Sequence, residues 1–386
     1  MATPPGEAEI ASLVAAAATS GMGVRVAGAG HSFSPVVQTD GLLLDLSRLS
    51  GIVGTDAEGL RAVVRAGTPI RGLYEPLWQR GLALRNQGAI DDQHLAGAVA
   101  TATHGSGISH TSLSGVVRSV TLIGSDGQRR RIGGGEPRLL RAAQVAVGML
   151  GVMTELEIEV ASAYRLTERV GVCAWEEVME RWDELVHGHR HANFFWMPMD
   201  ESASLYGIVA PGTTADRCYV KTYDEAAPGT PDLDVPGCRT GRCYRIYPGV
   251  FAPNFHELEY FVALERGPAA VAALRELMLA SLPDAVYPLG VRTVGADDAY
   301  LSPSYLTDTV AISIAGAPGT DYWTYLRSAD ALLAEFDARV HWGKLHFLTP
   351  ERLHAVYPAA HEFIAVRREL DPHGIFLNEH LRSLFE

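Results

Sequence analysis

The stretch VRVAGAGHSF, residues 24–33, joins a short β-type run to a turn that holds two glycines and a histidine. Gly28 and Gly30 remove side chains where the run ends, so backbone amides there can approach an anion such as a pyrophosphate. The alternative is a tight turn that binds no anion, which would show the same two glycines. Phe33 stands where the common dinucleotide fingerprint needs a third glycine, so the spacing disfavours a nicotinamide-type Rossmann site.

A second glycine-rich stretch, GAVATATHGSGISH at residues 97–110, combines small residues, hydroxyls and backbone amides in one segment. Such groups wrap phosphates and ribityl hydroxyls without adding net charge. A surface loop rich in small polar residues is the alternative for this stretch alone. Two such loops in one part of the chain favour a cofactor site.

Composition indicates a globular enzyme-sized chain. Of 386 residues, 47% are hydrophobic and 20% are charged, which suits a well-packed interior. The formal net charge of −13 repels nucleic acid and anionic membrane surfaces, so neither is an expected partner. The sequence shows no basic leader and no long apolar stretch, and we expect a soluble, cytoplasmic protein. The four cysteines are expected to be reduced, including the pair in CRTGRC, residues 238–243.

The pattern of expected strands and helices changes near residue 162. Before this point, short β-type runs alternate with helical spacing, which indicates an α+β unit. After it, aromatic strands and helices predict an antiparallel sheet with helices on one face. We expect a helix over 171–188, and a strand over 340–347 that places Trp342, Lys344 and His346 on one face.

Five segments together resemble the aldonolactone oxidase and alditol oxidase branch of the vanillyl-alcohol oxidase flavoproteins. They are VRVAGAGHSF, NQGAIDDQHLAGAVATATHGSG (86–107), VGMLGVMTELEIEV (147–160), HWGKLH (341–346) and LDPHGIFLNEHLRSLF (370–385). The resemblance spans nearly the whole chain. It implies an α+β, two-domain FAD-binding fold with an inserted substrate domain built on an antiparallel sheet with flanking helices. The expected division is 1–162 for FAD binding, 163–340 for substrate, and 341–386 returning to the FAD-binding domain.

The resemblance implies FAD as the cofactor and no metal. By match, His31 is the histidine that the family joins covalently to the flavin 8α-methyl carbon, although a histidine that only caps the loop or stacks on the ring is the alternative. Ala102 lies in the second loop, where a methyl group near the flavin would hinder oxygen, so oxidase and dehydrogenase both stay open. The other expected cofactor-binding residues are Gly28, Ala29, Gly30, Ser32, Phe33, Gly97, Thr103, His104, Gly105, Ser106, Gly107 and Val152.

The family also supplies a Glu-x-Arg pair and a lysine to the reaction. Arg292 and Lys344 match the arginine and the lysine, whereas Gly290 replaces the glutamate, which predicts a larger pocket and one hydroxyl acceptor fewer. Alternation in FHELEYF places Glu257 and Glu259 on one strand face, and either can accept the substrate proton or pair with a cation.

The predicted activity is hydride transfer from the CH–OH group of a sugar, sugar lactone, polyol or sugar-bearing metabolite to covalent FAD, with O₂ as the final acceptor. A flavin dehydrogenase or desaturase acting on a larger metabolite, and a non-catalytic flavin-binding protein, are the alternatives. The histidines of HGHRH, residues 187–191, alternate without nearby carboxylates, which is typical of a polar loop, and receive no role.

Overall fold

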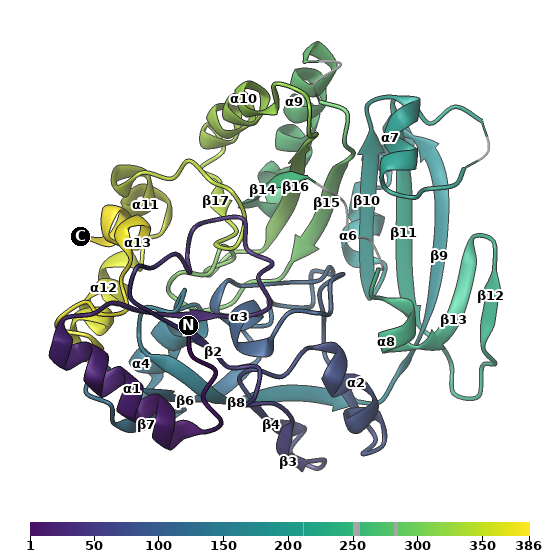
Figure 1. Cartoon of the computed structure of the whole chain (residues 1–386). Coiled ribbons are helices and arrows are strands. Elements are labelled where there is room, and N and C mark those ends of the chain that lie inside the picture. Colours follow the sequence, from purple (N-terminus) through teal and green to yellow (C-terminus); the bar gives the residue numbers. More distant parts are fainter. Residues whose placement is uncertain (211, 250–254, 282–284) are drawn as a thin grey trace.

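The computed structural model of the chain describes residues 1–210, 212–249, 255–281 and 285–386. Helices and strands are mixed along the whole chain, so the α+β class predicted from the sequence is confirmed. Three sheets carry the strands, and the two larger ones lie beside each other in Figure 1. Within the described ranges, no helix has both the length and the apolar character needed to cross a membrane.

A six-stranded antiparallel sheet forms most of the amino-terminal part of the molecule. Its central strand, β8 (Val152–Ser162), alternates buried and partly exposed residues, as the pattern of GVMTELEIEV predicted. The order is β3-β4-β8-β6-β7, and β5 also pairs with β8. The other strands are β3 (Ile52–Asp56), β4 (Arg61–Arg65), β5 (Leu82–Leu84), β6 (Val117–Ile123) and β7 (Arg129–Ile132).

Helix α1 (Glu7–Ser20) comes directly before the segment VRVAGAGHSF, residues 24–33. Gly21 ends it with a φ of 68°, a left-handed conformation that glycine adopts without strain, and this turns the chain into β1 (Val24–Ala27). β1 pairs in parallel with β2 (Leu42–Asp45) as a separate two-stranded sheet. The remaining helices of this part are α2 (Arg71–Trp78), α3 (Leu95–Ala100) and α4 (Pro137–Gln144).

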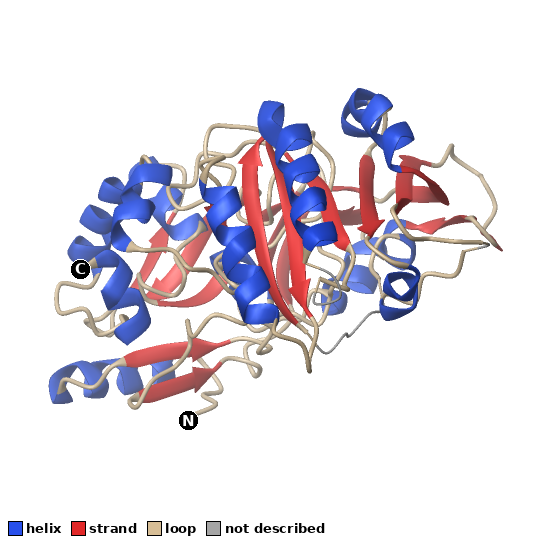
Figure 2. Ribbon diagram, turned by 90° about the horizontal axis from the view of Figure 1, so that it is seen from above, coloured by secondary structure: helices blue, strands red, loops and turns tan. Residues whose placement is uncertain are grey.

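The nine-stranded sheet begins where β8 ends, and each of its strand pairs is antiparallel, as predicted. Its order is β12-β13-β9-β11-β10-β15-β16-β14-β17. Helices α9 and α10 contact β14 and β16, and Figure 2 shows long helices lying along one face of the central strands. The strands are β9 (Arg165–Ala174), β10 (His191–Met197), β11 (Arg217–Glu225), β12 (Leu233–Val235), β13 (Cys238–Arg242), β14 (His256–Ala263), β15 (Leu289–Val294), β16 (Thr309–Gly316) and β17 (Arg339–Val340). The helices are α5 (Trp175–Glu180), α6 (Trp182–His187), α7 (Asp200–Leu205), α8 (Cys243–Ile246), α9 (Gly267–Ala280) and α10 (Tyr322–Ala334).

Two local predictions are wrong. The segment 171–188 is not one helix, because strand β9 continues to Ala174 and only then gives way to α5 and α6. The segment 340–347 is not a strand beyond Val340. A turn follows, in which the amide of Lys344 donates to the carbonyl of His341 (3.0 Å). The alternation expected for Trp342, Lys344 and His346 therefore does not apply.

The carboxyl-terminal helices pack against the amino-terminal part, where α12 contacts α4 (Figure 1). The Asn378 amide donates to the carbonyls of Pro35 (2.8 Å) and Gln38 (3.0 Å), which ties the tail to the loop after His31. The Arg382 guanidinium instead bonds within the tail. The tail helices are α11 (Pro350–Val356), α12 (Ala360–Leu370) and α13 (Glu379–Phe385).

Arg25 on β1 holds four chain segments together from the interior. Its guanidinium donates to the carbonyls of Val36 (2.8 Å), Val147 (2.7 Å), Gly148 (3.0 Å) and Phe376. The residue is 3% exposed, and burial lowers the pKa of its guanidinium to about 10. The loop after β1, the segment before β8 and the tail are thus fixed relative to each other by one side chain.

Candidate active site

Two adjoining cavities share part of their lining; the larger reaches the nine-stranded sheet, and the smaller lies among residues 25–153. The larger has a volume of about 370 Å³ and the smaller about 200 Å³. Four residues line both cavities: His31, Ser32, Gln93 and Thr101. His31 therefore lies at the junction of the two cavities.

The smaller cavity is a cradle of small residues. Gly28, Ala29, Gly30 and Gly97 line it together with His31 and Ser32. A Cβ on Gly28 would lie 3.8 Å from the Cα of Gly97, and a longer side chain on either would project into the space between the two loops. Gly30 has a φ of 78°, which favours glycine. The free backbone and the narrow width fit the extended diphosphate part of FAD.

Thr103 and His104 line the larger cavity instead. The other residues expected at the cofactor, Phe33, Gly105, Ser106, Gly107 and Val152, are not among the lining residues of either cavity. Gly105 is required by packing, because a Cβ there would lie 2.2 Å from Oδ1 of Asn86.

Ser106 is fully buried and anchored by the nine-stranded sheet. Its carbonyl accepts a hydrogen bond from Nδ1 of His191 (2.6 Å), and its hydroxyl accepts one from Tyr247 (3.0 Å). His191 is 1% exposed and begins β10, so the prediction of a polar loop is wrong for this residue. Its role is to hold the segment that carries Thr103 and His104.

The register of four adjacent strands builds one wall of the larger cavity. Phe195 on β10 lies opposite Gly290 on β15, Gly290 opposite Ser313 on β16, and Ser313 opposite Glu259 on β14. A Cβ on Gly290 would lie 3.3 Å from Cε1 of Phe195 and 3.4 Å from Cβ of Ser313. The space beside Gly290 is thus filled by neighbouring side chains, and the expectation of a pocket enlarged at this position is wrong.

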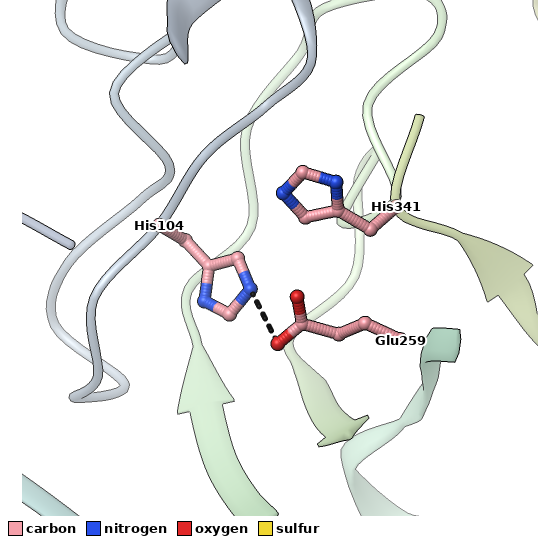
Figure 3. A group of neighbouring side chains, drawn as sticks. All are labelled: His104, Glu259 and His341. Atoms are coloured by element: carbon pink, nitrogen blue, oxygen red, sulfur yellow. Dashed lines mark ion pairs between the residues drawn. The ribbon is translucent and has the colours of Figure 1, made fainter. Parts of the chain in front are cut away.

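Glu259 is 4% exposed and surrounded by donors. Its Oε1 lies 2.9 Å from Oγ of Ser313 and 3.4 Å from Nη1 of Arg292. The same oxygen lies 3.3 Å from Nε2 of His104 (Figure 3). Burial opposes ionisation, but His104 above all, with His341 and Lys344, holds the pKa of Glu259 well below its usual range. This carboxylate is therefore a weak base and a strong anchor.

Glu257, two residues earlier on the same face of β14, forms an ion pair with Nζ of Lys344. Both glutamates line the larger cavity, while His256 is exposed on the opposite face, as alternation predicted. Burial favours the neutral amine, but Glu257 and Glu259 raise the pKa of Lys344, which keeps it charged. The two pairings that the sequence left as alternatives are both present.

Lys344 reaches the cavity because the chain turns at Gly343. Trp342 points elsewhere: its indole N–H donates to the carbonyl of Leu301 (2.7 Å). His346 packs against Trp342, with ring centroids 6.2 Å apart. Trp342 and His346 therefore pack in the core, whereas His341, Gly343 and Lys344 line the larger cavity.

His104, Glu259 and His341 each direct one ligand-type atom to a common region, with these atoms within 4.8 Å of one another (Figure 3). Two observations argue against a metal ion there. The Gly343 amide donates to Nδ1 of His341 (3.0 Å), which leaves the hydrogen of the neutral ring on Nε2. The cation of Arg292 also lies 3.4 Å from Oε1 of Glu259 and already neutralises this carboxylate. We therefore assign no metal.

Residues that the sequence alone did not single out complete the larger cavity. They include Gln93, Asn193, Phe195, Tyr206, Phe255 and His341. His341 belongs to the HWGKLH segment, so its position offered a signal, whereas the others depend on strand register or on loops far apart in the sequence. Phe195 is the clearest example, because its neighbour Gly290 is almost a hundred positions away.

Comparison with known proteins indicates the family of this chain. A family described as FAD binding domain matches residues 1–133, and one described as D-arabinono-1,4-lactone oxidase matches residues 239–384. An L-gulono-1,4-lactone dehydrogenase from Mycobacterium tuberculosis is 30% identical, over 99% of this chain and 94% of its own length. An alditol oxidase from Streptomyces sp. is 31% identical, over 98% and 94%. The crystal structure of cholesterol oxidase from B. sterolicum shares the fold, with a TM-score of 0.83 at 13% identity over 100% of this chain and 93% of that one.

Proposed function

Because this chain belongs to the aldonolactone oxidase and alditol oxidase branch of the vanillyl-alcohol oxidase type FAD-dependent oxidoreductases, we propose that it oxidises the CH–OH group of a sugar, sugar lactone, polyol or sugar-bearing metabolite. The observation that carries the proposal is the position of His31, shared by a glycine-walled cradle and a chamber with paired charges. FAD, when bound, would supply the hydride acceptor for a carbinol carbon held in that chamber.

Covalent attachment through His31 is part of the proposal. A ring nitrogen can bond to the 8α carbon only when its lone pair is free. Burial, followed by the charge of Lys344, lowers the pKa of His31 and so favours the neutral ring at pH 7. The same lysine, with Arg292, would stabilise negative charge that develops on the flavin side of the chamber.

Glu257 is the proposed proton acceptor. Glu259 is saturated by Ser313, His104 and Arg292 and is therefore the poorer base. Glu257 forms an ion pair with Lys344. When Glu257 takes up a proton and loses its charge, the ammonium of Lys344 still has the charge of Glu259 nearby. Loss of the hydroxyl proton to Glu257 would accompany departure of the hydride from the carbinol carbon.

The first experiment tests the cofactor and its link. The purified protein is precipitated with acid, and we expect the yellow colour to stay with the chain. His31→Ala is expected to release its flavin into the supernatant. His94→Ala is the matched control, since His94 lines the same small cavity, and its colour should stay in the pellet. A colourless wild-type protein that takes up no FAD would contradict the proposal, and a covalent flavin in His31→Ala would contradict the assignment of the link.

The second experiment tests the chemistry and the final acceptor. Polyols, lactones and glycosides are mixed with the holoprotein without oxygen, and bleaching of the flavin at 450 nm reports hydride transfer. Reoxidation of the bleached enzyme by air is then compared with reoxidation by a dye. We expect O₂ to reoxidise it with release of H₂O₂. Because a 30% identical relative is described as a dehydrogenase, preference for the dye would assign this chain to that alternative.

A further inference from the structure

The larger cavity has two chemically different walls. One wall carries Glu257, Glu259, Arg292 and Lys344 on or beside the central strands of the sheet. Another part of the lining carries aromatic rings, with Ile90 and Ile208 among its apolar residues. This division bears on the part of the substrate that does not react, and an inference about it rests on the function proposed above.

Among the described lining residues, each lysine and arginine is already paired with a carboxylate, including Lys221, whose Nζ lies 3.0 Å from Oε1 of Glu168. Arg292 lies 3.4 Å from Glu259, and Lys344 is paired with Glu257. A carboxylate or phosphate on the substrate would have to displace one of these glutamates and leave it buried without a partner, which is strongly unfavourable. A hydroxyl group needs no such exchange, because it can donate to a carboxylate and accept from a cation at the same time. The charged wall therefore fits an uncharged polyol or sugar.

The aromatic wall is continuous. The rings of Phe195 and Tyr206 have centroids 5.3 Å apart, and Tyr206 is stacked on Phe255 with an interplanar angle of 6° and centroids 6.3 Å apart. Ile208 lines the same space, and Ile90, which is 38% exposed, extends the apolar lining toward the surface. Large apolar side chains at such a position prefer contact with an apolar group over contact with water.

Phe195 stands where the two walls meet. It shares a register row with Gly290, Ser313 and Glu259, and strands β15 and β16 lie between it and the two glutamates on β14. Its ring packs directly on the backbone of Gly290, because no Cβ keeps it away. A substrate whose hydroxyl reaches the charged wall must therefore pass its next few atoms over or beside this ring.

We propose that the substrate is an uncharged polyol or sugar that carries a flat apolar group, such as an aryl substituent, and that Phe195 selects it. The hydroxyl end lies at Glu257 and Lys344, and the apolar group lies along Phe195, Tyr206 and Phe255. Burial and stacking of one phenyl ring against this wall should favour an aryl compound over its methyl analogue by about 30-fold in kcat/KM.

The test uses pairs of compounds that differ only in the apolar group. Phenyl β-D-glucopyranoside is compared with methyl β-D-glucopyranoside, and 3-phenoxypropane-1,2-diol with 3-methoxypropane-1,2-diol, by anaerobic bleaching of the holoenzyme. We expect the aryl member of at least one pair to bleach the flavin about 30-fold more efficiently. In Phe195→Ala the ratio of bleaching by the aryl member to bleaching by the small member should fall to about threefold or less. Phe195→Leu, which keeps an apolar side chain of similar volume, should show an intermediate preference.

The outcomes separate this inference from the proposed function. Equal or better bleaching by the small members, or by gluconate, overturns the aryl-substrate inference and leaves the oxidase function intact. A preference that survives in Phe195→Ala overturns the role of Phe195. Absence of bleaching by any CH–OH compound overturns the proposed function itself. If Phe195→Ala loses its flavin spectrum, the wild-type and Phe195→Leu ratios still decide.

Discussion

Replacing each of the two cavity glutamates by glutamine should separate a group that reacts from a group that holds the site together. Glu257→Gln removes the proposed proton acceptor and preserves its shape. A positioned general base contributes about 10² to 10⁴ in rate, so flavin reduction in Glu257→Gln should slow by that factor. The pair with Lys344 is buried, so its loss destabilises the fold, but Lys344 keeps the nearby charge of Glu259, and we expect the free energy of unfolding to fall by about 2 kcal/mol.

Glu259→Gln should have the opposite profile. At an effective dielectric constant of about 20, unit charges 3.4 Å apart attract by about 5 kcal/mol, which is the scale of the pairing with Arg292. Removing a buried carboxylate also removes its own desolvation penalty, so the net loss of stability is smaller, about 3 to 5 kcal/mol. The glutamine oxygen can still accept from Ser313. Among folded molecules, flavin reduction should slow by less than about tenfold.

The assay measures both quantities on the same preparations. Thermal unfolding gives the stability change, and anaerobic stopped-flow reduction at saturating substrate gives the rate per bound flavin. A carboxylate whose pKa is held low stays ionised as the pH falls. The stability that the charge of Glu259 supports should therefore persist down to pH 5 and be lost only when the pH falls below the ordinary pKa of a glutamate. The reasoning is refuted if Glu259→Gln abolishes reduction with an unchanged melting temperature while Glu257→Gln reduces the flavin at the wild-type rate.

Three further predictions follow from single side chains. Arg25→Met leaves four buried carbonyls without their donor and should lower the free energy of unfolding by at least about 4 kcal/mol, measured by urea unfolding, with earlier proteolysis of the tail. Burial raises the pKa of Asp297 to about 6, so between about pH 4 and 6 the native state binds a proton that the unfolded state does not. The stability of the wild type relative to Asp297→Asn should therefore rise by at most about 3 kcal/mol as the pH falls from 7.5 to 4.5. A difference in melting temperature that does not change with pH would contradict this. Gly28→Val should fill the narrow cradle against Gly97 and yield a folded but colourless protein, as judged by circular dichroism and absorbance at 450 nm.

Patterns of period two carried much of the sequence-based prediction. Alternation placed Glu257 and Glu259 on one face of β14 and His256 on the other, because a strand in the middle of a sheet cannot twist one side chain out of that order. The same rule failed at HWGKLH. There the indole of Trp342 finds its acceptor on Leu301, and the imidazole of His341 accepts the amide of Gly343. Both partners are set by the tertiary structure, and neither can be derived from the alternation of the segment.

The surroundings of Gly290 could not be predicted from the sequence, for a different reason. The sequence showed that a carboxylate was missing at this position, but what replaces it depends on which strand lies next to β15. That neighbour is β10, whose residues 193 to 196 pair with residues 292 to 289. The order β10-β15-β16-β14 is not the order of the chain, so no local pattern could have placed Phe195 over the glycine.

Sheet register also explains why the loss of one acidic side chain leaves a connected site. Glycine at 290 permits an aromatic ring to lie flat on the backbone, while Ser313, its neighbour on the other side, still donates to Glu259. The hydrogen bonds that hold Arg292 and His104 in place pass through Glu259 and do not require a side chain at 290. A substitution at this position therefore changes what the substrate meets and leaves the charges beside the cofactor cradle in position. This is the physical reason to look for the specificity of the protein at Phe195 and for its chemistry at Glu257 and Lys344.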